Sequence, residues 1–200
     1  MHILNYKVWI MAIPIIILLL FLKVILTNMK VSIRDLAITL LGIIYIVGLL
    51  AFIPLLNGLH NGKLLIWYIL FAAWGTDIFA YFVGKTIGKH KFSKISPKKS
   101  IEGCIGGLIG AVLSMVIYTI VINNVYNLDI SLVYISFIAV ILSAIGQIGD
   151  FAASTIKRHV GIKDFSNLIP GHGGMIDRID SVMFVAPFVY MFLVIIGSGI

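Results

Sequence analysis

Charge and cysteine are both scarce in this chain of 200 residues. Only 12% of the residues are charged, 60% are hydrophobic and the mean hydropathy is +1.11, a composition that excludes an ordinary soluble domain. Cys104 is the only cysteine, so no disulfide can form within the chain. Nitrogen and sulfur ligands are also too sparse for a zinc site. The composition therefore indicates an integral membrane protein.

Several patterns of catalysis and membrane insertion are missing too. The sequence has no nucleophile elbow with a Ser/His/Asp or Cys/His order, and no glycine-rich loop of the P-loop or Rossmann kind. Hydrolysis through a covalent enzyme intermediate is therefore not indicated. No apolar run alternates evenly as a membrane barrel strand does, so helices are the spanning structure that remains.

Six apolar runs are long enough to cross about 30 Å of hydrocarbon at about 1.5 Å per residue. The first is predicted to be a retained helix, because no small-residue cleavage site follows it. The sequence predicts an all-α fold, a polytopic membrane helix bundle of about six transmembrane helices with cytoplasmic active-site loops. The runs are Val8–Leu26, Leu36–Leu56, Leu64–Gly84, Gly103–Ile122, Leu132–Asp150 and Ile179–Gly197.

Basic residues are distributed unevenly over the connections between these runs. Thirteen of the fifteen Lys and Arg residues fall on one face, and only Lys7 and Lys63 fall on the other. The basic face is therefore expected to be cytoplasmic, with both termini outside. The net charge of +7 belongs to that face and favours anionic lipid head groups and phosphorylated metabolites over nucleic acid as partners.

One basic connection, residues 85–103, contains six lysines and three serines. Lysine ammoniums and serine hydroxyls are good phosphate donors, so Lys98 and Lys99 fit phosphate or nucleotide contacts. Ser100 and Glu102, with Ser96, fit capping of the next helix equally well.

Asp77 lies inside an apolar run, where a carboxylate costs about 2.5–3.5 kcal/mol. An acidic residue in this position predicts a functional site. The alternative is a structural pairing with a lysine or arginine of a neighbouring helix.

Charge is concentrated in residues 154–180, which hold four basic side chains, two histidines and three aspartates. If the fifth helix continues past Asp150, then Asp150, Ser154 and either Lys157 or Arg158 lie on one face. The glycines and proline of residues 170–174 should then break the chain. A new helix is expected to begin near Met175.

Asp177 and Asp180 lie three residues apart in the first turns of that helix, which places them on the same face. Two carboxylates so close repel unless a positive group lies between them. Helix-dipole capping explains one aspartate better than two. With Asp150 they offer three hard oxygen ligands, which suit Mg²⁺ and leave positions for water and phosphates. His172, in the glycine turn, is predicted to contact phosphate or position the loop.

These residues resemble the phosphatidate cytidylyltransferases, also called CDP-diacylglycerol synthases. The resemblance covers essentially Trp67 to the C-terminus. A second motif of that family is similar to Asp77-x2-Ala80-Tyr81-Phe82-x-Gly84, Gly88-Lys89 and Ser96-Pro97-Lys98-Lys99-Ser100-x-Glu102-Gly103. The main signature reads Ser154-x-Ile156-Lys157-Arg158-x4-Lys163-Asp164-x-Ser166-x2-Ile169-Pro170-x-His172-Gly173-Gly174-Met175-x-Asp177-Arg178-Ile179-Asp180.

The resemblance implies transfer of a cytidylyl group from CTP to phosphatidate, with release of pyrophosphate, in a multi-pass protein of the cytoplasmic membrane whose active site faces the cytoplasm. It implies a Mg²⁺ centre at Asp150, Asp177 and Asp180 and leaves open a second cation and a homodimer. The expected catalytic residues are Asp150, Lys157, Arg158, Asp177, Arg178 and Asp180. The expected substrate-binding residues are Asp77, Lys98, Lys99, Ser154, Lys163, Asp164, His172, Gly173 and Gly174.

The resemblance also divides the chain into N-terminal membrane helices without a motif, residues 1–63, and a catalytic membrane domain, residues 64–200. Members of the family usually carry additional N-terminal membrane helices. CTP-dependent lipid kinases and the archaeal ether-lipid cytidylyltransferase share this general plan and remain alternatives. A cation or phosphate transporter is the alternative from another class, but it should show internal repeats and polar residues near mid-membrane. Apart from Asp77, the helix interiors are expected to be apolar.

Overall fold

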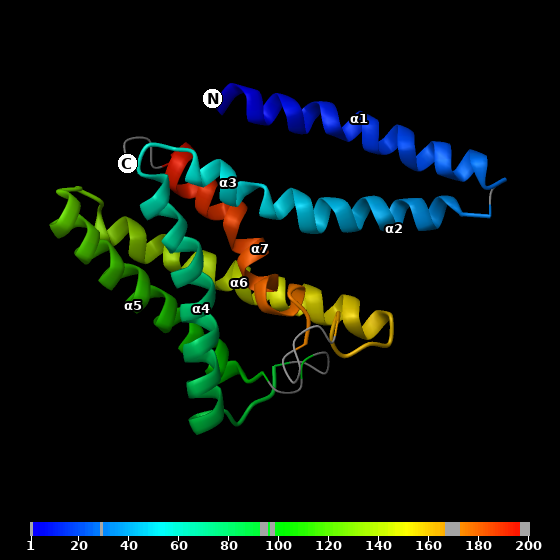
Figure 1. Ribbon diagram of the computed structural model, residues 1–200. Helices are drawn as coiled ribbons and strands as arrows, with labels where there is room; N and C mark the ends of the chain where they lie inside the picture. The colour runs from blue at the N-terminus through cyan, green and yellow to red at the C-terminus, as the bar shows by residue number, and fades with distance from the viewer. Residues whose placement is uncertain (1, 29, 93–95, 97–98, 167–172, 197–200) are drawn as a thin grey trace.

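The computed structural model describes residues 2–28, 30–92, 96, 99–166 and 173–196, with side chains over residues 12–193 of these ranges. Within those ranges the chain is helical, and an isolated bridge between Lys91 and Ser100 is the only strand-like pairing (Figure 1). The all-α fold class is therefore confirmed. In chain order the elements are α1 (His2–Leu26), α2 (Ile33–Ile43), the π-helical η1 (Ile44–Gly48), α3 (Phe52–Asn57), α4 (Gly62–Ile87), α5 (Ile101–Tyr126), α6 (Leu132–His159), α7 (Ile176–Tyr190) and the π-helical η2 (Met191–Ile196).

Four spans of the described chain are long and apolar enough to cross a membrane: Ile33–Asn57, Gly62–Ile87, Ile101–Tyr126 and Leu132–His159. The first of them combines α2, η1 and α3. The two remaining predicted runs are also helical, as α1 and as α7 with η2. The polytopic helical bundle is thus confirmed, with four of the six predicted spans reaching full membrane length among the described residues.

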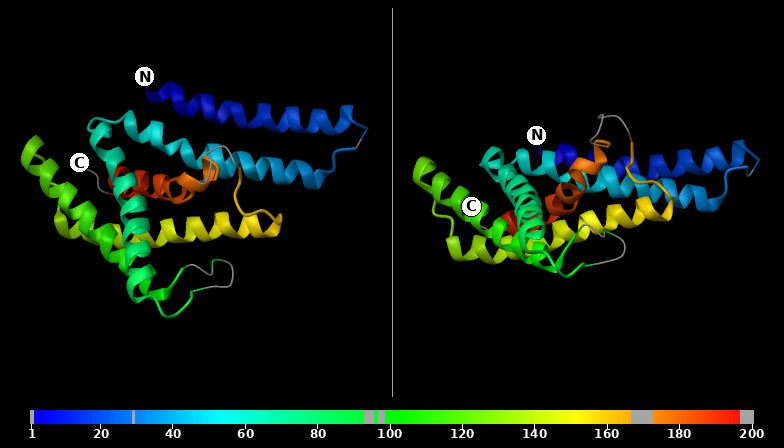
Figure 2. Two further views of the ribbon diagram at one scale, coloured as in Figure 1. Left: turned by 60° about the horizontal axis from the view of Figure 1, so that its bottom comes forward. Right: turned by 90° about the horizontal axis from the view of Figure 1, so that it is seen from below.

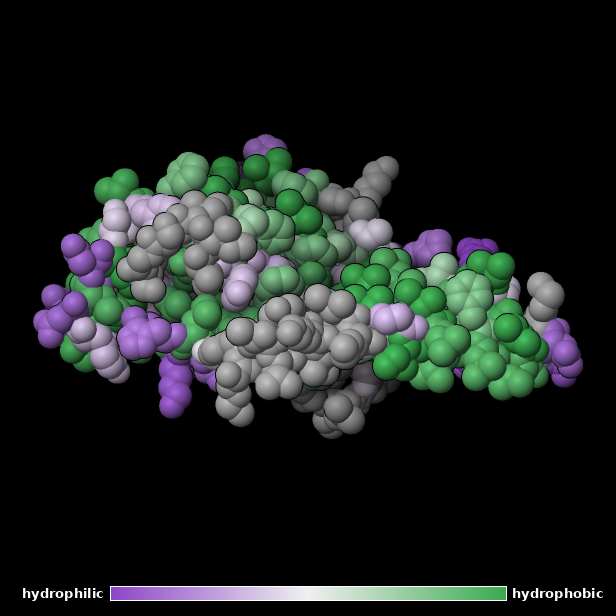
Figure 3. Space-filling model, turned by 90° about the horizontal axis from the view of Figure 1, so that it is seen from above, coloured by the Kyte–Doolittle hydropathy of each residue, from purple (hydrophilic) through white to green (hydrophobic). Residues whose placement is uncertain are grey.

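The core of the bundle is formed by α4, α5, α6 and α7. Helices α4 and α5 pack against each other most extensively, and α6 contacts both α5 and α7. The N-terminal hairpin of α1 and α2 lies at one side (Figures 1 and 2), where only 6% of the span Ile33–Asn57 is buried, against 39–44% for α4, α5 and α6. On the face that Figure 3 shows, the coloured surface is mostly apolar, with hydrophilic residues gathered mainly towards its ends. This distribution suits helices that contact lipid.

Helix ends follow the local signals of the sequence. Ser100 caps α5 by accepting a hydrogen bond from the backbone N–H of Gly103, with an N–O distance of 3.1 Å, which confirms capping for this serine. Helix α6 continues past Asp150 to His159, and the next helix begins at Ile176. Both predictions are therefore confirmed.

Glycines let α4 and α5 approach closely. A Cβ atom on Gly110 would collide with the Cβ and Cγ of Phe79 on α4, and one on Gly106 would collide with Val83. Small residues at such positions allow close backbone contact, on which helix association in lipid depends. The site described below depends on this contact, because residues of both helices line it.

Replacing Gly110 with alanine is expected to destabilise the protein by about 1–3 kcal/mol, because Phe79 is fixed near its backbone and cannot move aside easily. Thermal unfolding in detergent micelles measures the effect. Gly42 in α2 is the matched control, since a Cβ there meets nothing within 4 Å, and its replacement should be neutral or stabilising by up to about 1 kcal/mol. Equal shifts in Tm for the two variants would contradict the packing argument.

Polar side chains inside the bundle form hydrogen-bonded pairs. The hydroxyls of Tyr68 and Thr119 lie 2.7 Å apart between α4 and α5, and Thr76 donates to Ser143 of α6 at 2.7 Å. The expectation that Asp77 is the only polar interruption was wrong, because these residues satisfy one another across helices that are distant in the sequence.

Candidate active site

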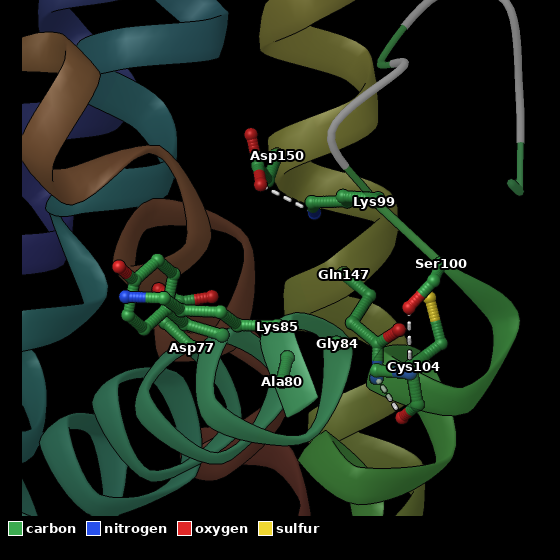
Figure 4. A pocket seen from close by; sticks show the side chains of 11 residues that line it. Asp77, Ala80, Gly84, Lys85, Lys99, Ser100, Cys104, Gln147 and Asp150 are labelled. Atoms are coloured by element: carbon green, nitrogen blue, oxygen red, sulfur yellow. Dashed lines mark hydrogen bonds and ion pairs between the residues drawn. The ribbon is translucent and has the colours of Figure 1, made fainter. Parts of the chain in front are cut away.

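A cavity of about 480 Å³ lies between α4, α5 and α6, next to the connection that joins α4 to α5. Figure 4 shows Lys99 reaching from that connection towards Asp150 on α6. Charged and apolar groups therefore share one cavity. Its lining consists of Asp77, Ala80, Tyr81, Gly84, Lys85, Lys99, Ser100, Gly103, Cys104, Gln147 and Asp150.

Asp150 and Lys99 form an ion pair in this cavity. Both side chains are about three-quarters buried, and the Lys99 ammonium also lies 4.4 Å from the centre of the Phe151 ring. A lysine predicted from a connection and an aspartate predicted from a helix are therefore brought together. Lys98, predicted beside Lys99, lies outside the described residues.

Asp77 is connected to α7 through a serine. The Ser181 hydroxyl donates to Asp77 Oδ2 at 3.0 Å, in place of the lysine or arginine partner considered from the sequence. The neighbouring Asp180 is buried, and its Oδ1 accepts the backbone N–H of Ser181 at 2.8 Å. Asp180 also lies within electrostatic range of both Asp150 and Asp77. Asp77, Asp150 and Asp180, from α4, α6 and α7, thus form a carboxylate cluster whose members lie within electrostatic range of one another.

Asp177 has a different environment from Asp180. Its Oδ1 lies 2.6 Å from the ammonium of Lys157, and its Oδ2 accepts the backbone N–H groups of Phe165 and Gly174 at 2.9 Å each. Both side chains of this ion pair are largely buried. Because Asp177 binds α6 and two parts of the loop before α7, it holds that loop in place.

The structure shows that Lys157 and Arg158 have different environments, a difference that the sequence could not predict. Lys157 is buried and turned to Asp177. Arg158 is exposed, and its Nη1 donates to the carbonyl oxygen of Ile162 at 3.4 Å. Ser154 is half-buried on the same helix. Among these cations, Lys157 is the one fixed within the protein.

The loop between α6 and α7 contains the remaining predicted residues. Lys163 and Asp164 are exposed, as is Arg178 in the first turn of α7. Gly173 has a φ of +79°, which suits glycine, and a Cβ on Gly174 would collide with Ser166. Backbone conformation therefore explains the glycine at position 173, and close packing explains the one at position 174. His172 lies outside the described residues.

Carboxylate oxygens are suitable ligands for Mg²⁺, which is often bound by one or two carboxylates together with phosphates. Asp150 and Asp180 offer such a pair. Within the described ranges, however, no three His, Cys, Asp or Glu side chains are close enough together to hold a metal ion. Asp177 is engaged by Lys157 and two N–H groups, so the centre of three aspartates stays a prediction.

Gln147 lines the cavity without having been predicted. Its Nε2 donates to the carbonyl oxygen of Cys104 at 3.1 Å and so connects α6 to α5. It is a polar residue in an apolar run, so the argument that singled out Asp77 would also have found it. Cys104 also lines the cavity.

Comparison with known proteins identifies the family of the chain. The sequence profile of the cytidylyltransferase family matches residues 2–196. Three similar proteins are each named phosphatidate cytidylyltransferase. The one from Bacillus subtilis (strain 168) is 43% identical over 143 residues, which cover 71% of this chain and 52% of the relative. The one from Staphylococcus haemolyticus (strain JCSC1435) is 39% identical over 176 residues, covering 85% and 64%. The one from Thermotoga maritima is 37% identical over 158 residues, covering 76% and 56%.

The chain thus spans between about half and two thirds of the length of these relatives. The profile match, in contrast, extends over nearly the whole chain, from α1 through η2. It includes every element that contributes to the cavity and to the carboxylate cluster. The chain therefore belongs to the cytidylyltransferase family.

Proposed function

We propose that this protein transfers a cytidylyl group from CTP to phosphatidate, forming CDP-diacylglycerol and pyrophosphate. The observation that carries this proposal is the meeting of carboxylates and lysines in one cavity between membrane helices, which Asp77 and Asp150 line together with Lys85 and Lys99. The buried Asp180 lies within electrostatic range of both aspartates. Such a site suits two polyanionic substrates together with a cation. The names of the relatives support the choice of substrates.

The reaction requires little covalent chemistry from the protein. An oxygen of the phosphatidate phosphate attacks the α-phosphorus of CTP, and a new P–O bond forms. The bond between the α-phosphorus and the oxygen that bridges to the β-phosphorus breaks, and pyrophosphate leaves with the electron pair. Because the attacking oxygen is already anionic, the main tasks are to bring the substrates together and neutralise their charge.

Three lysines are placed for these tasks. Lys99 lies in the cavity beside Asp150, and Lys85 lines the same cavity from α4. Their ammoniums would bind phosphate oxygens of either substrate. Lys157, buried against Asp177, would hold the loop that precedes α7 while adding positive charge near Asp180.

Asp150 and Asp180 would hold Mg²⁺, with Asp177 as the third predicted ligand. When bound, the ion would supply Lewis-acid stabilisation of phosphate charge. The chain's own contribution is to keep two largely buried carboxylates from different helices, α6 and α7, within electrostatic range of each other.

We infer that the site faces the cytoplasm, because thirteen of the fifteen Lys and Arg residues belong to the connections on its side. Tyr81, which lines the cavity, and Phe82 beside it are both largely exposed on α4. An anionic lipid could therefore place its head group in the cavity and its acyl chains against an apolar helix surface.

The position of a radioactive label tests this function. With purified protein, Mg²⁺ and phosphatidate, the label of [α-³²P]CTP is expected to appear in the lipid, whereas that of [γ-³²P]CTP is expected to appear in pyrophosphate. Label from the γ-phosphate in the lipid would instead indicate a lipid kinase. Ion or phosphate flux through proteoliposomes without any CTP turnover would favour a transporter.

A further inference from the structure

The hydroxyl of Tyr45 is a buried polar group without a partner. Among the residues that the structure describes, it is the only buried side-chain nitrogen or oxygen that forms no hydrogen bond. Other tyrosines of the bundle have acceptors: Tyr118 donates to the carbonyl oxygen of Leu64 at 2.8 Å, and Tyr134 donates to that of Phe192 at 2.6 Å. Burying a hydroxyl group away from water without a hydrogen-bond acceptor costs free energy. We therefore expect a bound ligand to supply the missing acceptor for Tyr45.

Packing places Tyr45 beside the carboxylate cluster. Its ring contacts that of Phe184 edge to face, with 5.8 Å between the ring centres. Phe184 lies one turn after Asp180 on α7, and a Cβ on Gly149 would collide with the Phe184 ring. Phe184 therefore contacts both Tyr45 and the α6 backbone next to Asp150. The carboxylates of Asp180 and Asp150 are accordingly within electrostatic range of the Tyr45 hydroxyl.

The backbone around Tyr45 is also unusual. Residues Ile44–Gly48 form the π-helical segment η1 inside the otherwise α-helical span Ile33–Asn57. Single π-helical turns within α-helices are rare and are found frequently at functional sites. This observation is independent of the missing hydrogen bond and points to the same residue.

We propose that the Tyr45 hydroxyl donates a hydrogen bond to a phosphate oxygen of a substrate held at Asp150 and Asp180. A neutral phenol is a donor that needs an acceptor, and carboxylates with a bound cation would bring phosphate to this place. The phosphate belongs either to phosphatidate or to CTP, since both present the same oxygen chemistry. The N-terminal helices then contribute to the site, although the sequence showed no motif in residues 1–63.

This inference rests on the proposed function and is tested by removing one oxygen atom. Tyr45→Phe keeps the ring on Phe184 and deletes only the hydroxyl. We expect kcat/KM to fall about 10- to 100-fold, as for the loss of a hydrogen bond to a charged group. We also expect Tm to stay the same or rise slightly, because no hydrogen bond of the free protein is lost. A rise in KM for phosphatidate identifies the lipid as the phosphate source, and a rise in KM for CTP identifies the nucleotide.

Tyr68→Phe is the matched control. Its hydroxyl is buried and lies 2.7 Å from that of Thr119, outside the cavity lining. This variant should lose stability and keep kcat/KM. The opposite pattern, in which Tyr45→Phe lowers Tm and leaves kcat/KM within twofold of the unchanged protein, would overturn the inference.

A binding measurement separates this inference from the proposed function. If the unchanged protein does not turn over, calorimetric titration with short-chain phosphatidate and with a non-hydrolysable CTP analogue still compares it with Tyr45→Phe. At least tenfold weaker binding of either ligand by the variant supports the role of Tyr45. If the variant and the unchanged protein bind each ligand with the same affinity, the inference is refuted.

Discussion

Replacing Asp180 with asparagine is expected to lower cytidylyl transfer by about a thousandfold and to leave the protein folded. The substitution conserves shape, and the amide oxygen can still accept the N–H of Ser181. It removes, however, a negative charge from the buried meeting point of α4, α6 and α7. Because Asp150 and Asp77 repel this charge, its loss should not reduce stability.

Pyrophosphate release and thermal unfolding, measured on the same preparation, test this result. Asp129→Asn is the matched control, because Asp129 is exposed in the connection between α5 and α6 and does not line the cavity. It should change neither quantity. Turnover of Asp180→Asn within twofold of the unchanged protein would rule out a role for Asp180 in binding the cation.

Replacing Lys157 with methionine is expected to have a large effect on stability as well as on activity. The substitution leaves Asp177 buried without its ion-pair partner, a change that typically costs about 3–5 kcal/mol. The loop before α7 loses the ion pair that connects Asp177 to α6, so only the contacts from Phe165 and Gly174 remain on Asp177. Activity should fall about a hundredfold or more, since misplacement by about 1 Å has that effect.

A double substitution distinguishes the effect of an unpaired buried charge on stability from the effect of losing Lys157 on activity. Lys157→Met combined with Asp177→Asn removes both charges, so part of the lost stability should return while activity stays low. Lys63→Met is the control, because Lys63 is exposed near the start of α4 and belongs neither to the cavity lining nor to the ion pair of Lys157 and Asp177. Equal stability of the single and the double variant, measured by thermal unfolding, would contradict the ion-pair argument.

Much of the fold was predictable because hydrocarbon thickness and apolar length determine where helices lie. Each predicted run corresponds to a helical segment, and the extension of α6 to His159 followed from the absence of helix breakers. The hairpin of α1 and α2 was predicted as two helices, but its position at the side of the core was not. Packing between helices depends on residues far apart in the sequence, which spacing alone does not relate.

The candidate site was predictable where charge conflicted with an apolar surrounding. This argument found Asp77, whereas Asp150 was found from its place at the end of a helix and Lys99 from the lysines and serines of one connection. The structure places all three in one cavity. The sequence could not tell Asp177 from Asp180, because a spacing of three places both on one face. The difference arises from tertiary contacts: Lys157, Phe165 and Gly174 surround one carboxylate, and Ser181 binds the other.

Residues whose role depends wholly on partners from other helices were missed. Neither Ser181 nor Tyr45 belongs to a recognisable sequence pattern. Ser181 is relevant because it binds Asp77, and Tyr45 because it lies near the carboxylates of α6 and α7. No hydropathy or spacing rule would single them out.

Mass spectrometry of the lipid product tests the central claim most directly. The purified 200-residue chain, reconstituted in vesicles that contain phosphatidate and supplied with CTP and Mg²⁺, is predicted to form CDP-diacylglycerol and an equal amount of pyrophosphate. Chelation of Mg²⁺ should stop product formation, and the substitution Asp180→Asn should lower it about a thousandfold. Vesicles with folded protein that yield no CDP-diacylglycerol would contradict the account.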